Sequence, residues 1–462
     1  MTSPTVLWFR RDLRLADHPA LIQAAADKAD VLGVFVSDDV TLGSSGAPRQ
    51  AFLAGCLAEL SDSMGGRLLV VHGRPHRVIP QLASSIGAQA VHASADYGPY
   101  GARRDERVAD ALHAKDIDWV TSGSPYAVAP GRVRKPDGGR YSVFTPYFRG
   151  WTSHGWRAPA GGGTPPSVSW FDPAELDRPL RHDPAELDRA IPDGMQLPTT
   201  GEAAAQRTWQ EFLDRAVDDY DDQRNRPDHP GTSRMSPYLK WGCVHPRTLL
   251  ADLANRRSAG AASYRRELAW REFYADIVHH LPESIWTSVD PVIDAMEWDE
   301  GKEADERFLA WKQGRTGYPY IDAGMRQLLA QGWMHNRVRM GVASFLIKDL
   351  HLPWQWGARH FLDHLVDGDY ASNNHGWQWV AGSGAQASPF FRVFNPITQG
   401  EKFDPRGDYV RSFVPELRGI DGKAVHRPWE LDDAPADYPA PLVDHATERA
   451  ETLQRWESRP RG

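Results

Sequence analysis

The segment DGDYASNNHGWQW, which begins at Asp367, concentrates carboxylates, carboxamides and indoles without an activated nucleophile. Asp367 and Asp369 could accept hydrogen bonds from a ribityl chain or a ring edge, and Asn373 could face a heteroaromatic nitrogen. Trp377 and Trp379 add flat, easily oxidised surfaces. The pattern therefore favours electron transfer at a flat ring over hydrolysis. The alternative is an Asn-Asn turn between helices with core tryptophans, and the segment alone does not separate the two.

A hydroxyl-rich loop lies in GTSRMSPYLKWG, residues 231–242, where glycine leads into a predicted helix. Thr232, Ser233 and Ser236 could meet a phosphate there, because free N–H groups and the helix dipole attract anions at a helix start. An ordinary Ser/Thr N-cap is the more common explanation for any single case.

The segment ELAWREFY, residues 267–274, sets Glu267 and Arg271 one helical turn apart with Trp270 beside them. A carboxylate, a guanidinium and an indole would then project from one region of a helix. A solvated i,i+4 salt bridge explains the same spacing if the segment is taken alone.

In the segment GWMHNRVRM, Asn336 and Met340 share a helical face that Arg337 and Arg339 flank. This arrangement suits a carboxamide and a soft thioether presented to a base, with arginines on phosphates. The surrounding stretch 311–348 carries six Lys or Arg against one acid, although the net charge of the chain is -8. A basic surface helix is the alternative.

Composition excludes several classes of protein. The chain has 462 residues, 41% apolar and 25% charged, which predicts two or three globular domains. No apolar run approaches the ~20 residues that span a bilayer, and no signal-peptide pattern precedes the first strand, so a cytoplasmic protein is expected. Only Cys56 and Cys243 are present, which excludes a disulfide framework and a four-cysteine iron-sulfur cluster. No HExxH or GxSxG motif occurs, so neither a metal site nor a serine hydrolase is predicted.

The first ~125 residues alternate short apolar runs with helical patterns, which predicts a parallel sheet with crossover helices. No GxGxxG or GxxxxGK[ST] follows the first run, so no Rossmann or P-loop nucleotide site is predicted. Asp17, followed by His18 and Pro19, is predicted to cap the first helix. The predicted strands are Val6–Phe9, Val31–Val36, Leu68–His72, Ala90–Ser94 and Trp119–Thr121.

Between residues 126 and 200 the sequence is rich in Gly and Pro, and the heptapeptide DPAELDR occurs at 172–178 and at 183–189. Two copies are too few for a solenoid, so this stretch is predicted to be a linker with two short helical turns. The helical patterns that follow are longer, and 13 of the 18 tryptophans lie after residue 200. The predicted helices are Gln206–Val217, Tyr264–His279, Asp322–Leu329, Val338–Lys348 and Trp356–Leu365.

Taken together, these motifs resemble those of the photolyase/cryptochrome family. The matching segments are WFRRDLRLADHPAL, GTSRMSPYLKWG, ELAWREFY, TGYPYIDAGMRQLLAQGWMHNRVRM and DGDYASNNHGWQW, in this order between about residue 5 and Pro428. The resemblance implies an α/β N-terminal parallel-sheet domain that carries an antenna chromophore, joined by a long linker to an all-α FAD-binding and DNA-repair domain. The implied boundaries are 1–125, 126–200 and 201–462.

The resemblance implies that FAD, folded into a U and active in its reduced form, lies in the helical domain. Asn373 would lie against the N5 atom of its isoalloxazine ring. The other residues implied to hold the cofactor are Tyr220, Thr232, Ser233, Arg234, Met235, Ser236, Arg271, Asn336, Arg339, Asp367 and Asp369.

The implied reaction is light-dependent repair of cyclobutane pyrimidine dimers (CPDs) in duplex DNA, as in class I photolyases. An electron from excited, reduced FAD would split the dimer and then return, which makes the reaction formally that of a lyase. Glu267, Asn336 and Met340 match the CPD pattern, whereas six-four relatives carry His at the positions of Asn336 and Met340. Trp270 and Trp379 would be the walls that receive the flipped dimer. Relatives of the DASH group, which prefer single-stranded DNA, typically have Tyr at the position of Trp379. The tryptophan in this chain therefore favours duplex substrates.

Four arginines are candidates for the phosphate contacts that set the register of the protein on DNA without reading its sequence. They are Arg224, Arg226, Arg337 and Arg392. The lesion itself would meet Glu267, Trp270, Asn336 and Trp379.

Trp377, Trp354 and Trp298 resemble the tryptophan chain that delivers electrons from the surface to oxidised flavin in this family. Trp286 or Trp311 could take the place of Trp298, because the spacer after Trp298 is longer than in the best-known enterobacterial relative.

For the antenna, the segment ADYGPYGARRDERV, which begins at residue 95, resembles relatives that bind 8-hydroxy-5-deazaflavin, with Asp38, Arg49 and Arg103 as contacts. Relatives that bind methenyltetrahydrofolate carry a His and a Glu where this chain has Ser44 and Arg107. Deazaflavin is therefore expected rather than folate, and an empty pocket is the remaining alternative.

The expected partner is damaged double-stranded DNA, and no membrane is expected. We expect a monomer in the bacterial cytoplasm that associates with the nucleoid through DNA. The alternative function is a blue-light-sensing cryptochrome without repair activity, which the retained Glu267, Asn336 and Asn373 disfavour.

Overall fold

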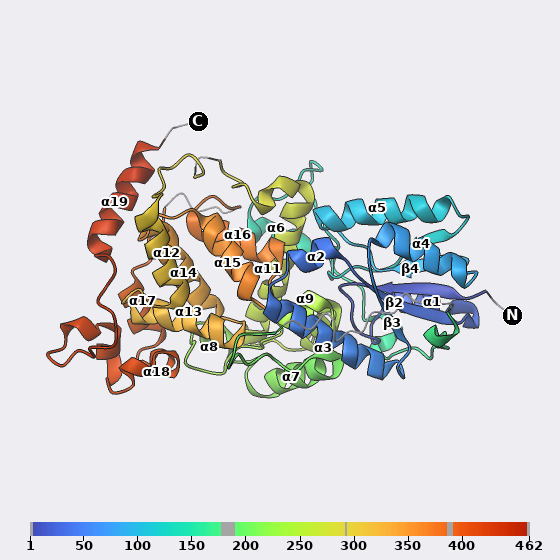
Figure 1. The fold of residues 1–462 in the computed structure, drawn as a ribbon, viewed down its shortest axis with the longest axis horizontal. Coiled ribbons are helices and arrows are strands. Elements are labelled where there is room, and N and C mark those ends of the chain that lie inside the picture. Colours follow the sequence, from blue (N-terminus) through green and yellow to red (C-terminus); the bar gives the residue numbers. More distant parts are fainter. Residues whose placement is uncertain (1–2, 177–189, 292, 386–390, 460–462) are drawn as a thin grey trace.

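The computed structural model describes residues 3–176, 190–291, 293–385 and 391–459. An α/β part with one parallel sheet lies beside a larger, mostly helical part (Figure 1). The predicted fold class, a parallel-sheet domain followed by a helical domain, is confirmed.

The sheet has five strands in the order β3-β2-β1-β4-β5, and every neighbouring pair is parallel. Side chains alternate between its two faces, since Leu7 and Phe9 pack in one hydrophobic cluster while Val6 and Trp8 pack in another. Both faces are buried, as a sheet with crossover helices requires. The strands are β1 (Thr5–Phe9), β2 (Val31–Ser37), β3 (Leu68–His72), β4 (Ala90–Ala93) and β5 (Asp118–Thr121).

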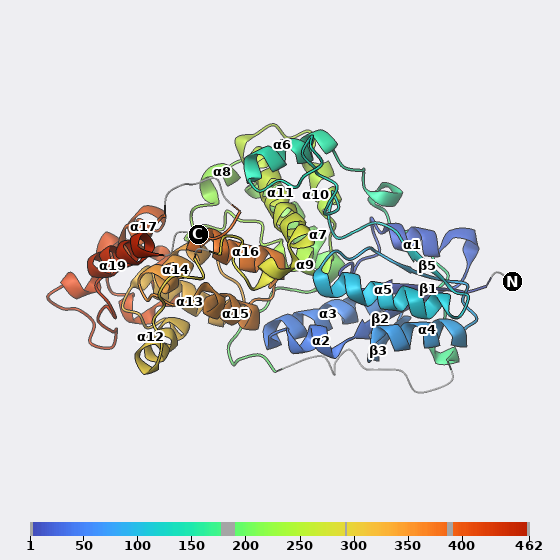
Figure 2. The same ribbon diagram turned by 90° about the horizontal axis from the view of Figure 1, so that it is seen from above.

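The helices of the α/β part surround this sheet, and those of the helical part follow it in the chain (Figures 1 and 2). They are α1 (Pro19–Ala24), α2 (Asp39–Gly43), α3 (Ala47–Ser63), α4 (Pro75–Ser85), α5 (Pro99–His113), α6 (Phe144–His154), α7 (Gly201–Arg215), α8 (Tyr220–Gln223), α9 (Ser236–Trp241), α10 (Pro246–Leu253), α11 (Ala259–His280), α12 (Lys302–Gln313), α13 (Pro319–Gln331), α14 (Asn336–Lys348), α15 (Trp354–His364), α16 (Tyr370–Ala381), α17 (Pro396–Phe403), α18 (Asp408–Phe413) and α19 (His445–Ser458).

All five predicted strands and all five predicted helices are present, with ends displaced by a few residues. One capping prediction is wrong. His18 is the N-cap of α1, because its side chain accepts a hydrogen bond from the Leu21 N–H. Asp17 instead has a positive φ and accepts hydrogen bonds from Arg247 at 2.7 Å and Thr248 at 3.1 Å, which ties the α/β part to α10.

The stretch predicted as a linker contains a helix that the sequence analysis missed. Helix α6 packs on α11, where Trp151 donates a hydrogen bond of 2.6 Å to buried Glu272 (Figure 2). Its aromatic residues Phe144, Tyr147, Phe148 and Trp151 have the i, i+3, i+4, i+7 spacing of one helical face, which was the available signal. Of the two predicted helical turns, the first copy of DPAELDR contains a short 3-10 turn, and the second copy lies outside the described residues.

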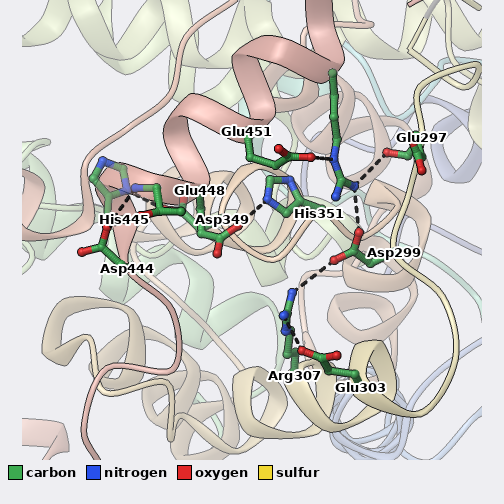
Figure 3. Close-up of polar contacts among 12 residues, drawn as sticks. Glu297, Asp299, Glu303, Arg307, Asp349, His351, Asp444, His445, Glu448 and Glu451 are labelled. Carbon is green, nitrogen blue, oxygen red and sulfur yellow. Dashed lines mark hydrogen bonds and ion pairs between the residues drawn. The ribbon is translucent and has the colours of Figure 1, made fainter. Parts of the chain in front are cut away.

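The C-terminal helix α19 returns along the helical part and is held there by ion pairs (Figure 3). His445 lies 2.5 Å from buried Asp349, and Glu448 lies 2.6 Å from buried His351. Arg455 pairs with Asp299 at 2.8 Å. Helix α19 therefore holds the loop that carries residue 298, a predicted member of the tryptophan chain.

Candidate functional site

The hydroxyl-rich loop packs against aromatic side chains. The Ser233 hydroxyl is 2.8 Å from the Tyr264 hydroxyl, and the Arg234 guanidinium lies 4.4 Å from the centre of the Trp333 ring. Trp333 in turn donates a hydrogen bond of 3.4 Å to Ser236. Tyr220 is also here, with its ring 5.2 Å from that of Tyr264. Six of the residues implied to hold FAD therefore belong to one neighbourhood, because Thr232 and Met235 are part of the same loop.

The loop is not an ordinary N-cap. Met235 occupies the N-cap position of α9, and no side chain caps the helix. Arg234 has a φ of 50°, a left-handed conformation that a non-glycine residue rarely adopts. The N-cap alternative is therefore wrong for α9, although the Ser233 hydroxyl accepts a hydrogen bond of 3.3 Å from the Met235 N–H.

The Asn-Asn pair lies inside a helix, so the alternative of a turn is wrong. Asp369 is the N-cap of α16 and accepts a hydrogen bond from the Ser372 N–H. Asn373 donates to the Ala358 carbonyl at 3.0 Å and to the Asn374 side-chain oxygen at 2.8 Å. Because both amide hydrogens of Asn373 are used, its Oδ1 atom is the group left to meet a ligand.

Asp367 and Asp369 sit in different electrostatic surroundings. Asp367 accepts a hydrogen bond of 2.8 Å from Arg339 through Oδ2, while its buried Oδ1 has no partner among the described residues. Asp369 lies 3.0 Å from Arg11 and 3.6 Å from Lys240. Burial alone would raise the pKa of Asp369, but these two cations lower it. Asp369 therefore joins the two parts of the protein, whereas Asp367 keeps an acceptor free.

Glu267 and Arg271 do not form the salt bridge that their spacing suggested. Arg271 donates to the carbonyls of Pro125 and Leu239 at 3.0 and 3.1 Å. Glu267 pairs with Arg224 at 2.6 Å instead. The i,i+4 alternative is therefore wrong, and the carboxylate faces α8.

Helix α14 brings its polar residues to the same region. Arg337 donates to the Asn225 side-chain oxygen at 3.1 Å and contacts the Met340 sulfur at 3.6 Å. Asn336 is the first residue of α14 and its side chain is exposed. Burial raises the pKa of Glu267, and the positive charges of Arg224 and then Arg337 oppose this rise.

Trp270 has one face covered. Its ring stacks on Phe144 of α6 with a centroid distance of 3.7 Å and an interplanar angle of 7°. Trp379, the second predicted wall, is partly buried on α16. Phe144 was not among the predicted site residues, because nothing in the local sequence relates it to a helix about 120 residues later.

The predicted DNA contacts are partly engaged within the protein. Arg226 is held by Asp228 through bonds of 2.8 and 2.5 Å. Arg392 has an exposed side chain, and its carbonyl accepts a hydrogen bond from buried Lys348. Arg224 and Arg337 lie beside Glu267, as described above.

The predicted electron-transfer tryptophans lie in one hydrophobic cluster. Trp377 and Trp354 are buried, with exposed fractions of 3% and 0%, and Trp298 is partly buried against the same cluster. Trp311 is fully buried with its ring centre 6.1 Å from that of Trp377. Trp311 therefore cannot be the surface end of a chain, whereas partly exposed Trp286 can.

A cavity of about 620 Å³ opens between the α/β part and the helical part. Asp38, Arg49 and Arg103 all line it, and so does Ser44. Its volume is in the usual range of small-molecule sites. Arg49 is largely engaged already, since its guanidinium donates to the Ser44 carbonyl at 2.7 Å and to the Leu365 carbonyl at 3.4 Å.

Charged groups inside this cavity have shifted pKa values. Burial lowers the pKa of Lys240 to about 7. Burial alone would raise the pKa of Asp96, but Arg104, Arg11 and Arg10 lower it to about 2. The cavity is thus lined by charges of both signs, because Asp38, Asp96 and Asp369 face it together with the arginines and Lys240.

Two further features of the described residues bear on the class of site. The described ranges contain no cluster of three or more His, Cys, Asp or Glu side chains that could hold a metal ion. None of the helices in the described part of the chain has the length and apolar character that crossing a bilayer requires.

Comparison with known proteins identifies the family. The family described as DNA photolyase matches residues 5–166, and the FAD binding domain of DNA photolyase matches residues 264–458. A deoxyribodipyrimidine photo-lyase of Streptomyces griseus is 42% identical over 97% of this chain and 98% of its own length. The chain belongs to the photolyase/cryptochrome family. Its helical domain is therefore an FAD-binding domain of this family, as predicted.

Solved members of the family have the same fold. A class III photolyase from Agrobacterium tumefaciens is 37% identical, with a TM-score of 0.91 over 99% of this chain and 98% of that one. A cryptochrome from Synechocystis is 26% identical, with a TM-score of 0.86 over 98% and 99% of the two chains. The family prediction is thus confirmed, and assignment to class I stays a prediction.

Proposed function

We propose that this protein repairs cyclobutane pyrimidine dimers in damaged double-stranded DNA when it absorbs light. The observation that carries the proposal is that Glu267 of α11 pairs with Arg224 at 2.6 Å and Met340 of α14 contacts Arg337 at 3.6 Å, on helices that also carry predicted cofactor residues. Full-length relatives named deoxyribodipyrimidine photo-lyase support the same substrate. Asn336 and Met340 in place of histidines support CPDs over six-four lesions and a class I assignment.

The helical part offers groups that fit FAD. The buried Oδ1 atom of Asp367 lacks a partner among the described residues, and the free Oδ1 atom of Asn373 can accept a hydrogen bond from a reduced ring nitrogen. The Ser236 hydroxyl accepts one hydrogen bond from Trp333 and could donate its own hydrogen to a phosphate or ribityl oxygen. When bound in its reduced form and excited by light, FAD supplies the electron that opens the dimer and takes it back afterwards.

The chain's residues would receive and orient the lesion. A damaged pair costs only a few kcal/mol to extrude from the duplex, because it stacks poorly. Trp270 would stack on the flipped dimer with the face that Phe144 does not cover, and Trp379 would form the opposite wall. Glu267 and Asn336 would bond its carbonyl and imide edges, which stabilises the charge that develops on the dimer oxygens.

The arginines would hold the phosphates on either side of the lesion. Arg337 has a partly exposed side chain and Arg392 an exposed one. Arg224 and Arg226 follow closely after the end of helix α8. Phosphate contacts of this kind make affinity fall as salt concentration rises. Release of Arg226 from Asp228 would be part of the cost of binding.

Trp377, Trp354 and Trp298 would carry electrons from the surface to oxidised FAD. The partial exposure of Trp298 supports its place at the surface end, and the burial of Trp377 and Trp354 supports interior positions for both. The route would restore the reduced cofactor in light without taking part in repair itself.

The cavity between the two parts would hold the antenna chromophore. Its volume of about 620 Å³ and its arginine-rich wall support an anionic, flavin-like ring such as 8-hydroxy-5-deazaflavin. Asp38 and Arg103 would contact it, whereas Arg49 would shape the wall through its bonds to carbonyls. An absorption spectrum of the purified protein distinguishes deazaflavin from methenyltetrahydrofolate and from an empty cavity.

The proposed repair is tested with an irradiated oligonucleotide duplex and chemically reduced protein. Thymine-dimer loss should occur in blue light and not in the dark. Glu267→Ala should lower the loss per photon absorbed while flavin stays bound. Flavin photoreduction without any light-dependent dimer loss would support the cryptochrome alternative and contradict the repair function.

A further inference from the structure

Arg224 and Glu267 form an ion pair at the mouth of the lesion site. Their side chains meet at 2.6 Å, with 25% and 28% of their surfaces exposed. Arg224 follows the last residue of α8 and also donates to Ser263 of α11 at 2.9 Å, which fixes its direction. The pair therefore joins two groups to which the proposed function assigns different partners in DNA. Arg224 would bind a phosphate, and Glu267 would bind the dimer.

Few other groups compensate the charge of Glu267. Arg337 of α14 also lowers the pKa of Glu267, but its guanidinium is bonded to Asn225 and Met340. The remaining titratable groups near the carboxylate are tyrosines from α8 and α11: Tyr220, Tyr264 and Tyr274.

Neutral tyrosines do not offset a negative charge, so ionisation of Glu267 depends mainly on Arg224. Burial raises the pKa of Glu267, and Arg224 and then Arg337 oppose this rise without cancelling it. Removing Arg224, or covering the carboxylate with a base, would raise the pKa further.

Bound DNA would both take Arg224 away from Glu267 and cover the Glu267 carboxylate. A phosphate accepts a bidentate, charge-assisted hydrogen bond from a guanidinium, so it competes directly with Glu267 for Arg224. The flipped dimer, stacked beside Trp270, would exclude the water that now reaches Glu267. An ionised carboxylate without its cation in such a site is strongly disfavoured.

We propose that Arg224 is a positioning residue that couples phosphate binding to proton uptake: when a DNA phosphate takes the Arg224 guanidinium, the Glu267 carboxylate takes one proton from solvent. The neutral acid then donates its O–H to a carbonyl oxygen of the dimer. No electron is exchanged in this step, and only the proton moves from solvent to a Glu267 oxygen. The inference rests on the proposed function and deepens it.

The switch has a consequence for the chemistry. An electron that arrives on the dimer would meet a repelling negative charge if Glu267 stayed ionised. A neutral acid instead presents a hydrogen-bond donor to the oxygens on which the charge develops. Repair would therefore be favoured only after Arg224 has bound a phosphate of the DNA backbone.

Calorimetry on the FAD-loaded protein tests the switch in the dark. The dimer-containing duplex is titrated near neutral pH in buffers of different ionisation enthalpy, and the slope of the observed enthalpy gives the protons taken up. We expect the wild-type protein to take up about one proton more than Glu267→Gln. Equal uptake by the two proteins would overturn the proposal.

Two arginine variants separate the switch from a general loss of binding. Arg224→Gln leaves Glu267 without its partner before DNA arrives, so its proton uptake on binding should fall towards that of Glu267→Gln. Arg226→Gln is the matched control, because Arg226 pairs with Asp228 and not with Glu267. It should weaken binding and keep the proton uptake, and loss of uptake in this control would contradict the role of Arg224.

A repair assay on the same preparation separates failure of the switch from failure of the proposed function. Light-dependent dimer loss with no difference in proton uptake overturns the switch and leaves repair intact. Absence of both binding and repair overturns the function, and the switch with it.

Discussion

Replacing Gly357 with Ala should disturb Trp377 more than any other residue. A Cβ atom at this position in α15 would lie 2.1 Å from the Cη2 atom and 2.5 Å from the Cζ3 atom of the Trp377 ring, and 2.6 Å from Leu346. Carbon atoms in contact lie about 3.5–4.0 Å apart, so the ring or the helix must move by roughly 1.5 Å. Trp377 is only 3% exposed, so the ring has little room to retreat.

The expected loss of stability follows from this overlap. Overpacking of a core costs about 1–3 kcal/mol, against a gain of about 0.5–1 kcal/mol when Ala replaces Gly inside a helix. Gly357→Ala should therefore unfold at lower urea concentration. It should also slow photoreduction of oxidised FAD, because the displaced ring is the predicted donor nearest to the flavin.

Gly376→Ala is the matched control on α16, because nothing lies within 4 Å of the Cβ atom it would add. This variant should be more stable by about 0.5–1 kcal/mol and photoreduce normally. Urea unfolding and flavin bleaching under blue light measure both effects. If the two variants shift stability in the same direction, the packing argument is refuted.

Three further predictions concern other parts of the protein. Trp377→Phe should block photoreduction of oxidised FAD yet spare repair by chemically reduced protein, and unchanged photoreduction would remove Trp377 from the electron route. Phe144→Ala should weaken binding of dimer-containing DNA about two- to thirteenfold, since the loss of one stacking contact is worth about 0.5–1.5 kcal/mol, and equal affinity in a filter-binding assay would contradict a supporting role for its ring. Asp349 is fully buried, and burial raises its pKa to about 6. The protonated carboxyl therefore stabilises the folded protein fully below the unfolded pKa, and this contribution is lost as pH rises through about 6. Asp349→Asn should therefore reduce the loss of stability between about pH 4 and pH 7 by about 2–3 kcal/mol, and unfolding curves with the wild-type pH dependence would argue against this assignment.

The sequence predicted features that depend on local periodicity. The strands follow apolar runs, and α11 and α14 follow the 3.6-residue pattern that placed Glu267 with Trp270 and Asn336 with Met340. The alternatives of a turn, an N-cap and an i,i+4 salt bridge were each reasonable for one segment. Tertiary contacts decided against all three.

What the sequence did not reveal depends on contacts between distant segments. The Arg224–Glu267 pair joins residues 43 positions apart, and Phe144 meets Trp270 across the two parts of the chain. Asp17 was predicted to cap the first helix because of the residues that follow it in the sequence. Its carboxylate instead accepts a hydrogen bond from Arg247. Such pairings have no local signature, because they depend on which helix faces arrive at the same place.

The central claim is that the helical part brings a flipped dimer within electron-transfer distance of reduced FAD. Time-resolved fluorescence of the reduced flavin tests it directly, with the dimer-containing duplex and the same duplex without the lesion. We expect the dimer to shorten the flavin lifetime, with two thymines restored for each dimer that is split and no change for intact DNA. An unchanged lifetime with bound, dimer-containing DNA would contradict the account.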